Sequence, residues 1–334
     1  MNSKKVLQAG FFAACLFVAG TFHAGAALQP QKLVPVGIAA GINLETQGAL
    51  IVGFAQQSAA RDAGFLEGDS ILSVNGTEID NAAELSGALA ASEGEVTILI
   101  QRAGRQITLK ATPDRSGGTP KLGVFVRDAM AGIGTITYYN PETMAYGALG
   151  HGISESGTGT LMPASGGKLV SCTLDAITPG AKGTPGELSG KIDPSKIMGS
   201  IEANTPFGIF GHLDTPWEGQ AMETACAAEI KPGPAKILSG VSGQLCEYAI
   251  KICAVYHGTD SGRDMLIEIT DPQLIDLTGG IVRGMSGSPI IQNGKLVGAV
   301  THVLVNEPLK GYAISIENML LVEKNSADSV EDAA

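Results

Sequence analysis

Apolar and polar positions alternate in short runs along the chain, and turn residues separate these runs. A period of two is typical of half-buried strands, whereas a helix needs apolar positions three or four residues apart. The first third of the chain predicts a small α+β unit, with strands at 48–54, 70–74, 96–101 and 106–111 and helices at 58–64 and 81–90.

The rest of the chain predicts almost nothing but strands. We expect each to be short and to end in a turn, at 122–126, 134–139, 168–174, 196–202, 248–256, 265–270, 281–283 and 296–305. Many short strands with few helices are typical of a closed or double β-barrel. A polar linker rich in Gly and Pro, residues 114–120, separates the two parts. The acidic segment 323–334 lacks aromatic residues and is predicted to be disordered.

The composition fits compact domains that are rich in turns. Of the 334 residues, 44% are hydrophobic and only 16% are charged, so the chain can bury a large core. The 45 glycines and the low aromatic share of 5% favour short strands over long helices. The formal net charge of −11 repels phosphate backbones, and we therefore expect no nucleic-acid partner.

The first 26 residues have the form of an export signal. Two lysines precede a largely apolar run over residues 6–22, and the small residues 24–26 match a signal-peptidase site. We therefore expect an extracytoplasmic protein that is either secreted or tethered to a membrane by an uncleaved segment 1–26. Cys15 lies inside the apolar run, and we interpret it as an apolar residue rather than a site of lipid attachment.

The cysteines and histidines do not indicate a metal site. No C-x-x-C pair is present, and no histidine stands at a zinc-ligand spacing. We expect neither a metal nor a cofactor. An exported chain can form disulfides, but we interpret the remaining thiols as buried apolar residues, namely Cys172, Cys226, Cys246 and Cys253.

Candidate chemistry gathers in segment 284–289, which reads Gly-Met-Ser-Gly-Ser-Pro. A serine nucleophile needs a base that takes its proton, and its attack on a carbonyl needs N–H donors for the developing oxyanion. The glycines around Ser286 permit a sharp turn in which the N–H groups of Gly284 and Ser286 point the same way. Ser286 is therefore the candidate nucleophile and these two N–H groups the candidate oxyanion hole, with Ser288 as the rival nucleophile.

Histidine is the candidate for the base. His151 has a glycine on each side, which leaves its ring accessible at a strand edge, and it lies far upstream of Ser286. This separation fits delivery of the base from the other half of a two-barrel fold. His212 is the strongest rival on local sequence, and we interpret His257 and His302 as structural.

A third residue should orient the base by accepting its other N–H group. The residue types alone leave several carboxylates open for this role, namely Asp175, Asp193, Asp214 and Asp271.

Segment 63–76, AGFLEGDSILSVNG, resembles the core of a bacterial PDZ domain, and the resemblance extends over residues 33–113. In that family an extended peptide adds to the sheet as a strand, and its carboxylate meets the N–H groups of a Gly-rich loop. The resemblance implies a peptide ligand for this domain. It also implies that the loop spans residues 36–42, with the peptide-binding residues Gly37, Ile38, Gly41 and Ile42.

Residues 121–322 resemble a chymotrypsin-like peptidase domain, because Gly-x-Ser-Gly-x-Pro precedes a hairpin whose second strand, 299–302, would line the substrate cleft. Three motifs narrow this resemblance to the stage IV sporulation protein B peptidase family: 150–153, 269–272 and 278–290. By that match Ser286 is the nucleophile, His151 the base and Asp271 the acid. Asp271 lies close before the serine, and Asp-Pro also starts turns, so Asp193 and Asp214 stay open as alternatives.

This resemblance implies an exported serine endopeptidase of sporulation signalling. Family members act between mother cell and forespore, where they cleave a membrane-bound inhibitory protein. The cleavage activates an intramembrane protease that matures a late sigma factor. Two other functions stay open: an inactive PDZ scaffold, and a hydrolase of small esters that uses the same serine. The presence of both Ser286 and His151 argues against the scaffold, and a peptide-binding neighbour argues against the ester hydrolase.

Overall fold

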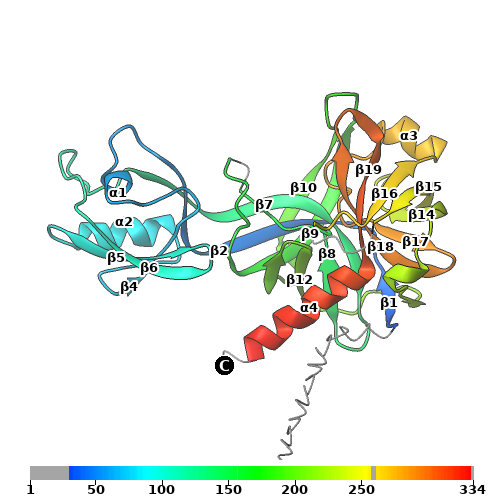
Figure 1. Cartoon of the computed structure of the whole chain (residues 1–334), viewed down its shortest axis with the longest axis horizontal. Helices are drawn as coiled ribbons and strands as arrows, with labels where there is room; N and C mark the ends of the chain where they lie inside the picture. The colour runs from blue at the N-terminus through cyan, green and yellow to red at the C-terminus, as the bar shows by residue number, and fades with distance from the viewer. Residues whose placement is uncertain (1–29, 156, 257–260, 332–334) are drawn as a thin grey trace, which may run out of the picture.

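The computed structural model describes residues 30–155, 157–256 and 261–331. The chain forms two lobes at opposite ends of its long axis, and two long strands, β2 (Ala39–Phe54) and β7 (Val124–Tyr139), run from one lobe into the other (Figure 1). The expected fold class is confirmed, since the strands form an N-terminal α+β domain, a half-barrel and a closed barrel.

The N-terminal lobe is a twisted sheet with strand order β7-β2-β3-β5-β6, and two short helices accompany it. Asn75 and Gly76 turn the chain between β3 and β4 with positive φ angles of 51° and 83°. The side chains of Ser58 and Asn81 cap the two helices, as Ser and Asn commonly do. The other elements of this lobe are α1 (Ala59–Asp62), β3 (Ser70–Val74), β4 (Thr77–Glu78), α2 (Ala82–Ala90), β5 (Val96–Arg102) and β6 (Arg105–Ala111).

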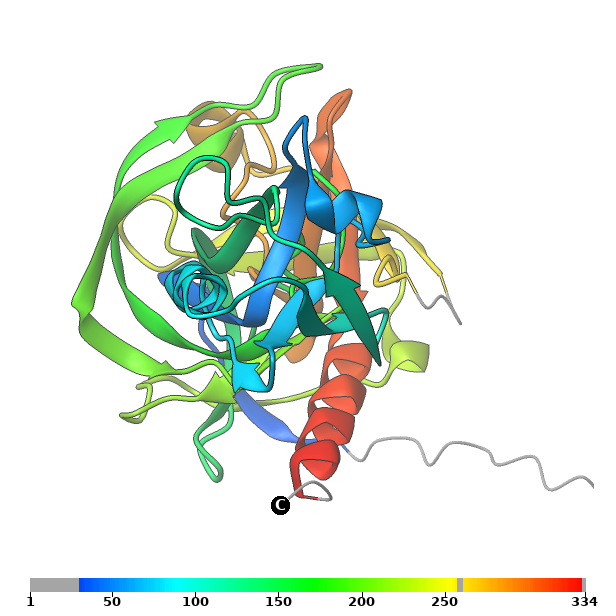
Figure 2. The same ribbon diagram turned by 90° about the vertical axis from the view of Figure 1, so that its left-hand side faces the viewer.

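The first part of β2, residues 39–46, and the later part of β7, residues 129–139, belong to the half-barrel. β2 pairs with β7 on one edge and with β9 on the other, and β10 continues the sheet as a curved hairpin with β9 (Figure 2). The remaining strands of this part are β1 (Lys32–Pro35), β8 (Ala145–Ala148), β9 (Ala164–Thr178), β10 (Glu187–Ser200), β11 (Ala203–Thr205), β12 (Gly208–His212) and β13 (Met222–Glu223).

Six antiparallel strands close the second barrel in the order β14-β15-β16-β19-β18-β17. Its interior holds a continuous apolar cluster that includes Ile237, Ile267 and Val300. The strands are β14 (Gly233–Ser239), β15 (Cys246–Val255), β16 (Met265–Ile269), β17 (Pro289–Gln292), β18 (Lys295–Leu304) and β19 (Glu307–Ser315), and the helical segments are the 3-10 turn Ala227–Glu229, α3 (Pro272–Thr278) and α4 (Ile316–Glu331).

Three expectations about local structure are wrong. Strands β2, β7, β9 and β10 are 14 to 16 residues long rather than short. Residues 281–283 lie in the loop before Ser286 and are not a strand. The segment from Glu323 continues helix α4 as far as Glu331, because the first turns of this helix place Ile316, Met319 and Leu320 in a buried cluster that supports it.

Of the expected Gly-rich peptide loop over residues 36–42, only residues 36–38 lie outside a strand. Gly41 and Ile42 lie inside β2, where Gly41 pairs with Ile133 on one side and with Val170 on the other. The N–H group of Gly37 donates to the carbonyl oxygen of Ile136. Gly41 is required for packing, since a Cβ there would lie 2.7 Å from a methyl group of Ile192. Gly37, Ile38, Gly41 and Ile42 therefore do not form a loop that receives a carboxylate.

Two further sequence-based expectations concern a membrane segment and the cysteines. No helix among the described residues is long and apolar enough to cross a membrane, and segment 1–26, the predicted signal or anchor, lies outside those residues together with Cys15. The four described cysteines are free thiols, and each is half-buried rather than fully buried.

Candidate active site

Ser286 lies in a tight loop between α3 and β17, and glycine makes the turn possible. Gly284 and Gly287 have φ angles of +96° and +97°, which side-chain-bearing residues rarely adopt. A Cβ on Gly287 would lie 2.0 Å from the carbonyl oxygen of Thr135. Strand β7 anchors this loop, because the Thr135 N–H donates to Ser286 O (3.0 Å) and the Thr135 hydroxyl to Gly284 O (2.7 Å).

The loop leaves two N–H groups for an incoming oxygen atom. Met285, Gly287 and Ser288 donate their N–H groups to Val282, Val300 and Met285, respectively. In the described part of the chain, the N–H groups of Gly284 and Ser286 have no acceptor. Both residues line the cavity that also holds the serine hydroxyl. N–H groups without an acceptor, close to a serine hydroxyl, are the donors that an oxyanion hole requires.

The hydroxyl of Ser286 points toward the closed barrel. Its Oγ donates to the carbonyl oxygen of Thr301 on β18 at 2.6 Å. Catalytic hydrogen bonds are often absent or poorly aligned before substrate binds. In this structure the hydroxyl proton of Ser286 is therefore directed at Thr301 rather than at His151.

His151 follows β8 in a bend formed by Leu149 and Gly150, both at φ +69°. Its Nδ1 lies 2.9 Å from the carbonyl oxygen of Gly152. A carbonyl only accepts hydrogen bonds, so we assign the ring proton to Nδ1, which leaves Nε2 free to accept a proton. Burial lowers the pKa of His151, and the hydrogen bond to Gly152 opposes this shift. The imidazole is therefore kept in the neutral form that a general base requires.

His151 and Ser286 line one open cavity of about 290 Å³, together with Ile42, Met130, Ile133 and Arg283. A second hollow of about 300 Å³ adjoins it and shares Gly132, Ile133, Arg283 and Gly284. The two hollows form a cleft between the half-barrel, which supplies His151, and the closed barrel, which supplies Ser286. The expected delivery of base and nucleophile from opposite barrels agrees with this arrangement.

The ring of His302 contacts that of His151, and the sequence did not indicate this contact. Its ring lies on β18 with its centroid 4.9 Å from that of His151 and an interplanar angle of 39°. Desolvation and the nearby His151 and Arg263 lower the pKa of His302 to about 4. Its position next to Thr301, in the strand expected beside the cleft, was the one signal that could have identified it.

None of the proposed acids contacts His151 among the described residues. Asp271 caps α3: its carboxylate accepts from the N–H groups of Gln273, Leu274 and Ala249. Asp193 binds Ser195 and Lys196 at an irregularity within strand β10. The oxygen that orients His151 in this structure is instead the backbone carbonyl of Gly152.

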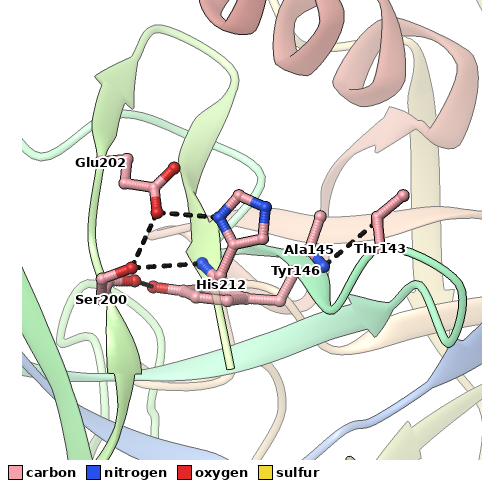
Figure 3. Close-up of polar contacts among 6 residues, drawn as sticks. All are labelled: Thr143, Ala145, Tyr146, Ser200, Glu202 and His212. Carbon is pink, nitrogen blue, oxygen red and sulfur yellow. Dashed lines mark hydrogen bonds and ion pairs between the residues drawn. The ribbon is translucent and has the colours of Figure 1, made fainter. Parts of the chain in front are cut away.

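His212, the rival base, belongs to a separate surface cluster (Figure 3). Its Nδ1 lies 2.8 Å from Glu202 Oε1, and the same carboxylate oxygen accepts the hydroxyl of Ser200 at 2.8 Å. The serine thus binds the carboxylate and not the imidazole, so this cluster does not activate a nucleophile. Both His212 and Glu202 have side chains that are 51% exposed.

Ser288, the rival nucleophile, is fully buried. Its hydroxyl has no hydrogen-bond partner among the described residues. A buried hydroxyl cannot reach a peptide carbonyl, so Ser288 supports the loop from within while Ser286 lines the cleft.

Comparisons with known proteins identify the family of the chain. The family described as SpoIVB peptidase S55 matches residues 118–320, and a PDZ domain matches residues 51–102. Among solved structures, the PDZ domain of an SdrC-like protein from Listeria monocytogenes is 18% identical, with 24% of this chain and 87% of that chain covered and a TM-score of 0.22. No curated protein matches the chain. The chain belongs to the SpoIVB peptidase S55 family and is a serine peptidase that carries a PDZ domain.

Proposed function

We propose that this peptidase is an exported endopeptidase of sporulation signalling, which cleaves a membrane-bound regulatory protein. The cleavage activates an intramembrane protease and so leads to sigma-factor maturation. The family match supports a role in sporulation, and the PDZ match supports a polypeptide as the substrate. We further propose that the protein acts between mother cell and forespore, delivered there by segment 1–26.

The observation that carries the proposed chemistry is the shared cleft of Ser286 and His151, with two N–H groups that have no acceptor. In this mechanism Ser286 Oγ attacks the scissile carbonyl carbon, and His151 Nε2 takes the hydroxyl proton. The N–H groups of Gly284 and Ser286 bind the resulting oxyanion. When the C–N bond breaks, His151 gives its proton to the leaving amine, and water then hydrolyses the acyl-enzyme.

His151 performs this cycle with the carbonyl of Gly152 as its partner. A carboxylate stabilises an imidazolium by its charge, whereas a carbonyl offers only a dipole. Because no proposed acid contacts His151 among the described residues, we propose that the site works as a Ser286–His151 dyad in which the carbonyl of Gly152 orients the ring. The contact with His302 fixes the other face of the base.

The proteolytic step is tested with fluorescein-labelled casein as the probe. We expect the wild-type protein and Ser288→Ala to release labelled peptides, and Ser286→Ala and His151→Gln to release none. Cleavage that persists in Ser286→Ala overturns the proposal. Absence of cleavage in the folded wild type favours the alternative, an inactive PDZ scaffold.

The signalling role is tested in the native host. Replacing Ser286 by Ala in the chromosomal copy should leave the sigma factor in its precursor form on an immunoblot during sporulation, while Ser288→Ala should allow maturation. Normal maturation in the Ser286→Ala strain would rule out this role.

A further inference from the structure

The peptide unit that joins Gly152 to Ile153 lies between His151 and an asparagine. Its carbonyl oxygen, on Gly152, is 2.9 Å from His151 Nδ1. Its N–H group, on Ile153, donates to Oδ1 of Asn204 at 2.8 Å. A peptide unit is planar and trans, so its C=O and N–H groups point in opposite directions. His151 and Asn204 therefore bind opposite edges of one rigid group.

The side-chain amide of Asn204 uses both of its N–H donors beside this peptide. Its Nδ2 donates to the carbonyl oxygen of Ile153 at 2.8 Å and to that of Met162 at 2.9 Å. A reversed amide would place its oxygen against these two carbonyls and its NH2 group against the N–H of Ile153, so only one orientation is favourable. Asn204 therefore fixes both ends of the loop 153–162 and, with them, the direction of the peptide.

Packing leaves this peptide little room to turn. A Cβ on Gly152 would lie 2.5 Å from the carbonyl oxygen of Thr205 and closer still to the side chain of Leu161. The N–H group of Gly152 donates to the carbonyl oxygen of Pro206 at 3.2 Å. Asn204, Thr205 and Pro206 are consecutive residues. One short segment therefore holds Gly152 both by a backbone hydrogen bond and by steric contact.

The strand that precedes His151 and the strand that carries Asn204 belong to one sheet. Strand β8 ends shortly before His151 and pairs with β12 (Figure 1), which in turn pairs with β11. Ile209 of β12 is the register partner of Ala148 on one side and of Asn204 on the other. The sheet thus fixes the base and the asparagine relative to each other.

This chain of hydrogen bonds acts on the ring of His151. A hydrogen bond to the N–H group of a peptide polarises the unit and makes its carbonyl oxygen a stronger acceptor. The carbonyl of Gly152 is therefore both fixed in direction and strengthened as the acceptor for Nδ1–H. The hydrogen bond at one ring nitrogen sets the tautomer, so this contact keeps Nε2 unprotonated.

We propose that Asn204 is a positioning residue that orients the base His151 through the Gly152–Ile153 peptide. This inference rests on the proposed proteolytic function, in which His151 takes the proton of Ser286. Asn204 fixes the peptide plane, and the plane fixes the ring and its tautomer.

The tautomer of His151 is the direct readout. Burial lowers the pKa of His151, so its ring is neutral at about pH 8. Nitrogen-15 spectra of the full chain, labelled at histidine, distinguish an Nδ1–H from an Nε2–H imidazole, and the signals that are missing in His151→Gln identify this ring. We expect the Nδ1–H tautomer in the wild type and a mixture of both tautomers in Asn204→Ala. The Nε2–H tautomer in the wild type overturns the inference without any variant of Asn204, as does an unchanged spectrum in folded Asn204→Ala.

Fluorophosphonate labelling of Ser286 measures the effect on the chemistry. Asn204→Ala should label about tenfold to a hundredfold more slowly per folded molecule, because a small misplacement of a catalytic group has an effect of this size. A wild-type labelling rate in Asn204→Ala overturns the inference alone. Wild-type labelling that does not depend on His151 overturns the proposed function with it.

A control variant in the same loop separates orientation of the base from support of the loop. The Glu155 carboxylate accepts the N–H groups of Gly157 and Thr158, both at 2.7 Å, and does not bind the Gly152–Ile153 peptide. Glu155→Ala therefore weakens the loop elsewhere, and we expect it to keep the wild-type labelling rate and the Nδ1–H tautomer. Equal slowing in Glu155→Ala and Asn204→Ala would show that Asn204 only supports the loop, which contradicts the proposal.

Discussion

Two serines only two positions apart, Ser286 and Ser288, have opposite surroundings. Ser286 lines the cleft and donates to Thr301, whereas Ser288 is buried with a hydroxyl that has no described partner. A buried hydroxyl without a hydrogen bond costs about 1–3 kcal/mol.

Ser288→Ala should therefore raise the free energy of unfolding by about 1 kcal/mol, because the unsatisfied hydroxyl is removed. Casein cleavage should stay at the wild-type level. Urea denaturation followed by tryptophan fluorescence measures the stability change, and a fall of similar size would mean that the hydroxyl does have a partner.

The protonation of His151 should determine the acid limb of activity. In the proposed mechanism the neutral imidazole is the active form, and burial lowers the pKa of His151 below the ordinary value of 6.5. Activity is thus fully present above that pKa and is lost as the pH falls through it. We expect the acid limb of kcat/KM to have a midpoint below pH 6.5, and a midpoint above that value would contradict the burial of the base.

Gly287 should be the most sensitive position of the nucleophile loop. Gly287→Ala combines a φ angle of +97° with a Cβ 2.0 Å from a backbone oxygen, so we expect a loss of about 3 kcal/mol or more. Gly294→Ala is the control: its φ angle is +78°, but no atom lies within 4 Å of the added Cβ, and the loss should be about 1 kcal/mol. Equal losses in denaturant unfolding would refute this account of the turn.

At the scale of elements, Asp271 has a structural role because it caps helix α3. The helix starts with Asp271 as its cap and Pro272 in its first turn, a common N-terminal pattern. This pattern could have revealed the helix from the sequence.

Asp271→Asn should lower the free energy of unfolding by about 1 kcal/mol, because an amide cannot accept all three N–H groups that the carboxylate now holds. The rate of fluorophosphonate labelling per folded molecule should not change. A folded variant that labels a hundredfold more slowly would instead identify Asp271 as the acid that assists His151.

The strand pattern was readable where strands are short and alternate, as in β3, β5 and β18. It failed for β7, because Ala129, Ala131, Gly132 and Gly134 interrupt the apolar alternation inside a continuous strand. It also failed for residues 36–42, since the pairing of Gly41 with Val170 joins distant parts of the chain that no local pattern relates. Local motifs predicted Ser286 and His151 as site residues. The contacts of His151 with Gly152 and with His302 could not be predicted, because they depend on the packing of two barrels.

At the scale of the whole molecule, the PDZ domain and the peptidase domain share the strands β2 and β7 (Figure 1). Ile42 of β2 and Ile133 of β7 line the catalytic cavity, while the distal ends of the same strands form part of the PDZ sheet. The PDZ sheet and the lining of the cleft therefore share two strands.

The central claim is that Ser286 is a nucleophile that His151 activates. The most direct measurement is the mass of the full-length protein after reaction with a fluorophosphonate, followed by peptide mapping of the adduct. We predict one adduct on Ser286 in the wild type and in Ser288→Ala, slower labelling by at least a hundredfold in His151→Gln, and none in Ser286→Ala. An adduct on another residue, or labelling that is unaffected by loss of His151, would contradict the claim.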